Sequence, residues 1–126
     1  VVRSLVAEGL IDTAHDVSLG GLAIALAEMA IVSGIGIDIA APTPTARLDT
    51  VWFGERSASI LVAVAADDLA AATDIIASAM VPFAEIGTVG GDTITFAPND
   101  QLHLAGATQA WANALVPDQG QEVHRG

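Results

Sequence analysis

The chain has 126 residues, a hydrophobic fraction of 52% and a formal net charge of −11. The length predicts one domain with its own core, and the acidic charge, opposed by four arginines only, disfavours a nucleic-acid partner. The absence of cysteine excludes a disulfide framework and a cysteine metal site, and the absence of lysine excludes a P-loop lysine and Schiff-base chemistry.

The first third of the chain reads as two helices and a strand. Apolar residues at near-helical spacing predict a short amphipathic helix over residues 2–9. Almost every position from Gly21 to Ser33 is apolar, and Gly34 suits a C-cap, so this segment predicts a helix buried on more than one side. Residues 36–40 alternate at period two, which predicts a strand.

The middle third predicts a helical turn, a strand and a helix. Residues 48–53 suit one helical turn, and the Val- and Ile-rich run 59–65 is typical of a central strand. Asp67 or Asp68 then caps a helix. The apolar stripe expected on that helix consists of Leu69, Ala72, Thr73, Ile76 and Met80.

The last third begins with a predicted hairpin. Two alternating segments, residues 84–89 and 92–96, flank Gly90 and Gly91, a pair typical of a two-residue hairpin turn. A second turn at 98–100 leads to a short segment, residues 101–104.

A closing helix is expected over residues 107–115, and residues 117–126 read as a polar, loose tail. We therefore expect one domain over residues 1–116. Interspersed helices and strands with tight turns predict an α+β fold, with a mixed, largely antiparallel sheet covered by helices.

Membrane insertion is not expected, because Glu28 and Asp67 interrupt the longest apolar runs well before the ~20 residues of a spanning helix. The chain opens on Val1 without an initiator methionine or a leader pattern, so we expect a fragment of a larger cytoplasmic protein. Its high apolar content predicts that part of its surface meets a neighbour.

The first candidate site is the stretch from His15 to Gly21. Free N–H groups and the helix dipole at Gly20 and Gly21 favour an anion such as phosphate, with His15 as a proton donor or phosphate contact. Alternatively, Asp16 or Ser18 caps the helix, the glycines permit close packing, and His15 is a structural histidine. Spacing alone leaves both readings open.

The second candidate site follows Gly54. Glu55, Arg56 and Ser57 place a carboxylate, a guanidinium and a hydroxyl together, a grouping suited to hydroxyl or phosphate recognition. The two charges could equally form a solvated surface pair. The remaining acidic residues are too scattered to predict a metal site, and no residue is assigned a catalytic role.

Three segments together resemble a known family. They are residues 14–30, reading AHDVSLGGLAIALAEMA, the Phe-Gly-Glu of 53–55, and Ile-Gly-Thr-Val-Gly-Gly-Asp over 86–92. The chain to about Val116 is similar to the last domain of phosphoribosylformylglycinamidine synthase. The wider superfamily includes aminoimidazole ribonucleotide synthetase, selenophosphate synthetase, thiamine-monophosphate kinase and a hydrogenase maturation protein.

This resemblance implies a partly ferredoxin-like α+β domain beside a nucleotide-binding domain. It also implies an ATP- and Mg²⁺-dependent ligase that phosphorylates the amide oxygen of formylglycinamide ribonucleotide and lets ammonia from glutamine displace the phosphate. The catalytic histidine and magnesium carboxylates of such enzymes lie in other domains, so the fragment alone is expected to be inactive. Its partners would be those domains and a glutaminase, and its own site an auxiliary nucleotide or phosphate cleft at a domain interface.

The sequence departs from the family pattern at two places. Leu19 stands where the family usually has Asp, and the arginine expected at position 59 is replaced by Ser59. Arg56 lies an odd number of residues away, which on a strand changes the face, so we do not expect it to reach the same ligand.

Two alternatives to the ligase domain remain open at this point. One is a stand-alone binding or scaffold module of the same fold, which the missing arginine and the apolar, acidic composition favour. The other is a domain of a sister kinase or synthetase. A homodimer of the isolated chain is also possible.

Overall fold

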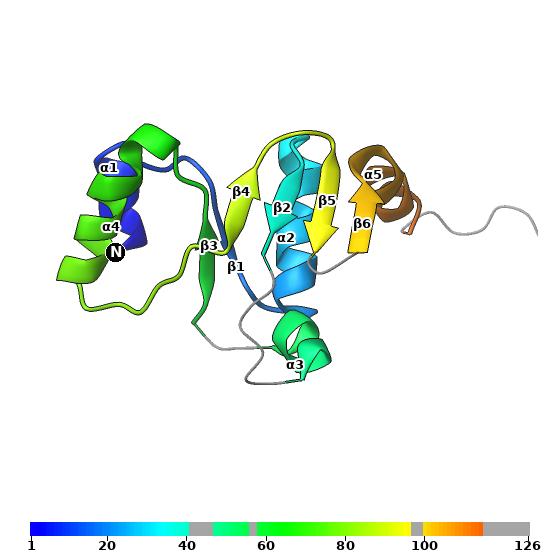
Figure 1. Ribbon diagram of the computed structural model, residues 1–126, viewed down its shortest axis with the longest axis horizontal. Helices are drawn as coiled ribbons and strands as arrows, with labels where there is room; N and C mark the ends of the chain where they lie inside the picture. The colour runs from blue at the N-terminus through cyan, green and yellow to red at the C-terminus, as the bar shows by residue number, and fades with distance from the viewer. Residues whose placement is uncertain (41–46, 56–57, 97–99, 115–126) are drawn as a thin grey trace, which may run out of the picture.

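The structure is a computed structural model, which describes residues 1–40, 47–55, 58–96 and 100–114. Its elements in chain order (Figure 1) are α1 (Val2–Ala7), β1 (Ala14–Asp16), α2 (Gly21–Ser33), β2 (Ile37–Ile39), α3 (Leu48–Phe53), β3 (Ile60–Val62), η1 (Ala66–Asp68), α4 (Leu69–Ser78), β4 (Gly87–Val89), β5 (Thr93–Phe96), β6 (Asp100–His103) and α5 (Leu104–Asn113). None of the described helices is long and apolar enough to cross a bilayer.

The main sheet has four strands in the order β4-β2-β5-β6. β2 is antiparallel to β4 and parallel to β5, and β5 is antiparallel to β6. Helices lie against this sheet, with α2 crossing behind β2 and β5 (Figure 1). The expected α+β class with a mixed, largely antiparallel sheet is confirmed.

The predicted hairpin around Gly90 and Gly91 is wrong, because β4 and β5 do not pair with each other. β2 lies between them and contributes backbone bonds to both strands. Gly36, just before β2, bonds to both turn glycines: its N–H donates to the Gly91 carbonyl at 2.9 Å and its carbonyl accepts from Gly90 at 2.8 Å. The glycine pair therefore carries the chain around the end of β2.

The main core lies between this sheet and its helices. Ile37 and Ile39 of β2 point inward while Asp38 points outward, as strand alternation requires. The side chain of Ile94 in β5 is completely buried. The other buried members of this core come from α2, α3, β2 and α5: Ala23, Leu26, Ala30, Ile37, Ile39, Trp52 and Leu104.

The prediction of a central strand over residues 59–65 is also wrong. Only Ile60–Val62 forms a strand, β3, and it pairs antiparallel with β1 in a separate two-stranded sheet. Its side chains serve two clusters: Leu61 packs against the main core, whereas Val62 packs against a second cluster under α1 and α4. A strand that contacts two separate hydrophobic clusters thus has the same apolar composition as a central strand buried on both faces.

The predicted stripe on the helix after Asp68 is only partly buried. Ala72 is buried and Ile76 is half-buried, but Leu69 and Met80 are exposed. Asp68 is the N-cap residue of α4, but its side chain makes no capping hydrogen bond.

Other helix boundaries follow the sequence closely. α2 and α3 have the predicted bounds, and α1 ends two residues early, at Ala7. α5 starts at Leu104 instead of 107, because burial of that leucine offsets a glycine in the first turn. The expected turn residue Pro98 and the expected tail over residues 117–126 lie outside the described residues.

Candidate functional site

The first candidate motif starts on β1 and continues into the turn before α2. β1 pairs with β3 in antiparallel register, with His15 opposite Leu61 and Asp16 opposite Ile60. One residue further, the Val17 N–H donates to the Ser59 carbonyl at 2.9 Å. This pairing fixes where the polar residues of the motif leave the sheet.

The two glycines of the motif permit close packing. Gly20 is the N-cap of α2 with φ +81°, and Gly21 has φ +75°, both in the left-handed region. A Cβ on Gly21 would lie 2.7 Å from the carbonyl carbon of Phe53 and 2.8 Å from the carbonyl oxygen of Trp52. The start of α2 therefore rests directly on the backbone of α3.

The capping alternative for Asp16 and Ser18 is wrong. The N-cap of α2 is Gly20, which has no side-chain oxygen to accept a hydrogen bond, and none of the described side chains makes a capping bond there. The Ser18 carbonyl instead accepts from the Gly21 N–H at 3.2 Å. The first N–H groups of α2 thus lack side-chain partners.

An open cleft of about 610 Å³ lies beside this turn. It joins two chain segments that are far apart in sequence, since Asp16 and Ser18 line it from one side and Glu55 from the other. Its remaining lining residues are Val17, Leu19, Ala58, Ser59 and Ile60. The structure therefore brings three predicted site residues together, while Arg56 and Ser57 lie outside the described residues.

Ser59 and Ala58 line the cleft but were not predicted as site residues. Ser59 could have been found, because it is the first residue of the predicted strand 59–65 and stands where the family resemblance leads us to expect an arginine. Ala58 has φ +61°, which no sequence pattern indicates for alanine. β3 begins only at Ile60, so strand alternation does not extend back across Ala58. Alternation therefore does not predict whether Arg56 reaches the ligand expected for an arginine at position 59.

His15 does not line the cleft. Its Nε2 lies 3.1 Å from Oε2 of Glu28 on α2, and its Nδ1 lies 2.7 Å from the Asp16 carbonyl oxygen. The ring thus connects β1 to α2. These contacts are those expected of a structural histidine.

The electrostatics of the cleft disfavour an anion held by the described residues alone. Asp16 and Glu55 each add a carboxylate, Ser18 and Ser59 add hydroxyls, and no described lining residue is cationic. A polyphosphate here would need positive charge from elsewhere. No group of three or more His, Asp or Glu that could hold a metal occurs among the described residues, so these residues do not fit a complete Mg²⁺ site or nucleotide site.

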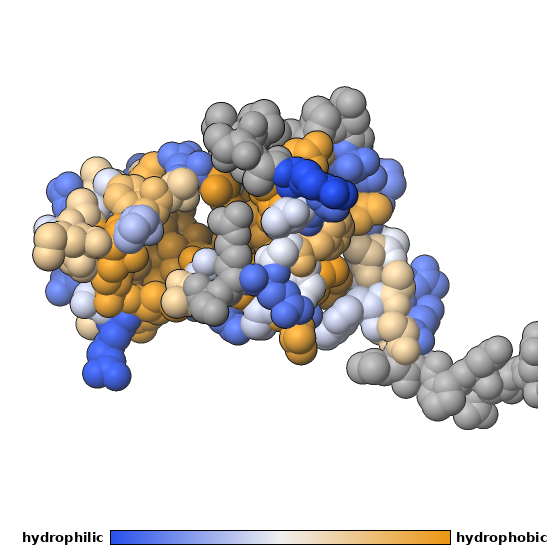
Figure 2. All heavy atoms as spheres, turned by 90° about the horizontal axis from the view of Figure 1, so that it is seen from below, coloured by the Kyte–Doolittle hydropathy of each residue, from blue (hydrophilic) through white to orange (hydrophobic). Residues whose placement is uncertain are grey.

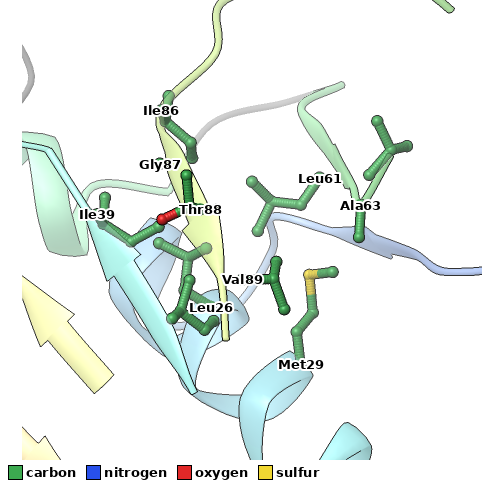
Figure 3. Close-up of a pocket in the computed structure, with 11 residues that line it drawn as sticks. Leu26, Met29, Ile39, Leu61, Ala63, Ile86, Gly87, Thr88 and Val89 are labelled. Carbon is green, nitrogen blue, oxygen red and sulfur yellow. The ribbon is translucent and has the colours of Figure 1, made fainter. Parts of the chain in front are cut away.

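A second, apolar cavity of about 70 Å³ lies between β3 and β4. Figure 3 shows Leu61 and Ala63 approaching it from one side, Val89 from β4, and Leu26 and Met29 from α2 below. Thr88 brings the one side-chain hydroxyl of the lining. A cavity this small and apolar is a packing gap between two strand edges and offers no polar recognition.

Comparison with known proteins places this fold and motif in a family. Residues 1–111 match the model of the AIR synthase related protein, C-terminal domain. The chain belongs to this family. The cleft beside β1 and α2 is therefore a feature of an AIR synthase related C-terminal domain.

Curated relatives of this AIR synthase related domain have a common name. The chain is 42% identical over 127 residues to phosphoribosylformylglycinamidine synthase subunit PurL of Sinorhizobium fredii, an alignment that covers 93% of this chain and 17% of that protein. It is 38% identical to the Synechocystis protein of the same name, with 90% of this chain and 16% of that protein covered. The chain thus spans about one sixth of the length of these relatives.

Solved structures agree on the fold. T. maritima PurL complexed with ATP matches with a TM-score of 0.68 at 14% identity, over 83% of this chain and 20% of that one. The structure of PurLQS from Thermotoga maritima matches with the same TM-score over 80% of this chain and 19% of that one. At this identity the likeness concerns the fold.

Proposed function

We propose that this chain is the C-terminal domain of the synthetase subunit of phosphoribosylformylglycinamidine synthase. The complete enzyme would convert formylglycinamide ribonucleotide, glutamine and ATP to formylglycinamidine ribonucleotide. The observation that carries the proposal is the identity of about two fifths to PurL subunits over more than nine tenths of the chain. The HDVSLGGL motif, residues 15–22, is a part of the chain in which this resemblance is specific.

Several finer statements belong to this proposal. The complete enzyme would use ATP and Mg²⁺ and act in the cytoplasm with a glutaminase subunit or domain, without a nucleic-acid or membrane partner. One solved relative is described as complexed with ATP, which supports the use of ATP, and one is described as PurLQS, which supports the presence of further subunits. The chain alone would be inactive, because the described residues assemble no metal site and place no cation in the cleft.

The role of this domain would be to build one wall of an auxiliary nucleotide or phosphate cleft and of a domain interface. Asp16, Ser18 and Glu55 would face the ligand together with backbone N–H groups of the first turn of α2. The positive charge would come from the remaining domains and from Arg56, beside Ser57. Hydrogen exchange with and without Mg·ATP tests this in the complete enzyme: protection of the amides of residues 18–21 is expected, and protection confined to other domains contradicts it.

The whole proposal is tested with a chimera. The region of the Sinorhizobium fredii subunit that aligns with this chain is replaced by it, and synthase activity is assayed with glutamine or ammonia. We expect activity within about ten-fold of the parent, which corresponds to ~1.4 kcal/mol in the activation free energy. A parent subunit without this region should be inactive.

The matched control for the chimera is the Gly21→Val variant, which should fail by misfolding. A chimera that folds and assembles like the parent but has no activity contradicts the proposal. A stand-alone binding module, or a domain of a sister enzyme, is not favoured, because the relatives are longer PurL subunits.

A homodimer of the isolated chain has one supporting observation. Val32 and Ile35 at the end of α2, and Trp111 of α5, expose apolar side chains. Sedimentation velocity over a range of concentrations would detect self-association. One species of 12.7 kDa at every concentration contradicts the homodimer.

A further inference from the structure

The ring of His15 faces acceptors on both of its nitrogens. The Asp16 carbonyl oxygen lies 2.7 Å from Nδ1, and Glu28 Oε2 lies 3.1 Å from Nε2. A carbonyl oxygen and an ionised carboxylate accept hydrogen bonds and cannot donate them. Both contacts are therefore hydrogen bonds only when both ring nitrogens carry a proton, that is, when His15 is an imidazolium.

We propose that His15 and Glu28 form a protonation-dependent latch that ties β1 to α2 and holds the cleft wall that begins at Asp16. The latch is closed when both ring nitrogens carry a proton and is open when one of them does not. The proposal concerns the stability of the wall and does not depend on what the cleft binds.

The surroundings of the ring contain no competing charge among the described residues. Glu28 is the only ionisable residue of α2. On β3, the residue opposite His15 is the apolar Leu61. The Asp16 side chain lies on the other face of β1 by strand alternation, where it lines the cleft. Glu28 is thus the described carboxylate that pairs with a charged His15 ring.

The position of the latch couples it to the cleft wall. The segment directly after His15 and Asp16 is held by the bond from the Val17 N–H to the Ser59 carbonyl, and both residues line the cleft. Loss of the tie between β1 and α2 frees the strand end that makes this bond. Because both side chains are partly exposed, at 28% and 39%, we expect a modest effect. Opening at Val17 should increase about two- to five-fold.

The first measurement is ¹H–¹⁵N NMR of the imidazole of His15, assigned with His15→Gln. At a pH that keeps the ring charged, we expect two ring N–H signals that exchange slowly with water. Glu28→Ala should remove the slow Nε2–H signal and leave the Nδ1–H signal. Only one slow ring signal in the unmodified chain, or an Nε2–H signal unaffected by Glu28→Ala, overturns the proposal.

The second measurement is amide exchange at Val17, corrected for the intrinsic pH dependence of exchange. Glu28→Ala should speed exchange about two- to five-fold, and raising the pH should have the same effect in the unmodified chain but not in Glu28→Ala. Glu28→Gln keeps the shape and an acceptor but not the charge, so it should have an intermediate effect. Equal pH effects in the unmodified chain and Glu28→Ala overturn the proposal.

The matched control is the ion pair between Arg47 and Asp49, in which Nη2 and Oδ2 lie 2.8 Å apart. Both side chains are exposed, and neither residue belongs to β1. Arg47→Gln should leave exchange at Val17 unchanged. An equal acceleration in this variant would mean that any lost ion pair loosens the chain, and would overturn the assignment of a specific latch.

Discussion

Two apolar regions of the molecule differ in how many side chains they bury. The main core, between the four-stranded sheet and α2, α3 and α5, contains eight buried apolar residues. The region formed by α1 and α4, hereafter the α1–α4 lobe, buries three: Leu5, Ile11 and Ala72. The lobe stands beside the sheet in Figure 1, joined to it through β1 and β3.

The lobe also leaves apolar side chains uncovered. Figure 2 shows apolar atoms gathered over a hollowed face of the lobe. Val6 of α1, Leu69 of α4, and Val81 and Phe83 just after it are exposed. A region with few buried contacts opens at a lower free energy than the core of the same chain. A high apolar content therefore indicates that a region needs partner surfaces to cover it. It does not indicate that the region is stable.

The largest expected effect compares one glycine from each region. Gly21→Val should destabilise the chain by more than about 3 kcal/mol, because the new side chain would overlap the backbone of Phe53 and Trp52 at a left-handed φ of +75°. Gly9→Val in the lobe shares a positive φ of +70° but meets no atom within 4 Å. It should cost only the backbone strain, about 1–2 kcal/mol. Urea unfolding measures both, and equal losses would refute the close contact of α2 with α3.

The second prediction compares fully buried side chains. Ile94→Ala in the main core should lower the free energy of global unfolding by about 2–5 kcal/mol, since Ile94 has an exposed fraction of 0%. Leu5→Ala in the lobe removes a side chain that is just as buried, at 1%. There we expect faster amide exchange in α1 and α4 with little change in β2 and β5. Faster exchange throughout the chain after Leu5→Ala would show that the two regions unfold as one unit.

The smallest effect is a stabilisation of the lobe. α4 ends in a Schellman motif. The Met80 N–H donates to the Ala77 carbonyl oxygen at 2.9 Å, and the Val81 N–H donates to the Ile76 carbonyl oxygen at 3.4 Å. Met80 occupies the left-handed position with φ +55° and is 90% exposed, so its side chain packs little. Met80→Gly should therefore stabilise α4 by about 1 kcal/mol.

The control for this variant is the preceding residue. Ala79 is the C-cap of α4 in right-handed helical conformation, so Ala79→Gly should destabilise the helix by up to about 1 kcal/mol. Amide exchange in α4 measures both changes. A loss of stability in Met80→Gly would mean that Met80 makes contacts that outweigh its backbone strain.

The candidate site could be predicted from the sequence only in part. The glycines before α2 indicated close packing, and the structure supplies the neighbour, the backbone of α3. Nothing in the sequence indicated that Glu55 would line the same cleft as Asp16 and Ser18, or that His15 would meet Glu28. Each of these contacts depends on how segments that are distant in the sequence pack together. Arg56 and Ser57 stay predicted site residues.

The local elements and the family motif are readable from the amino-acid sequence alone. Helix α2 was predictable at both ends, because almost every position in it is apolar and glycines stand before and after it. The inward and outward positions of β2 followed from its alternation. These features depend on residues within a few positions of one another, and the chain carries them wherever it folds.

Which strands are neighbours depends on long-range packing. Gly90 and Gly91 suit a tight hairpin, yet β2, about 50 residues earlier, lies between the two flanking strands and binds both. The run after Ser59 is apolar enough for a central strand, yet it forms an edge that joins two clusters. Turn preferences differ by a few kcal/mol at most, whereas burying Ile37, Ile39 and Ile94 together in one core gains more, so the long-range packing prevails.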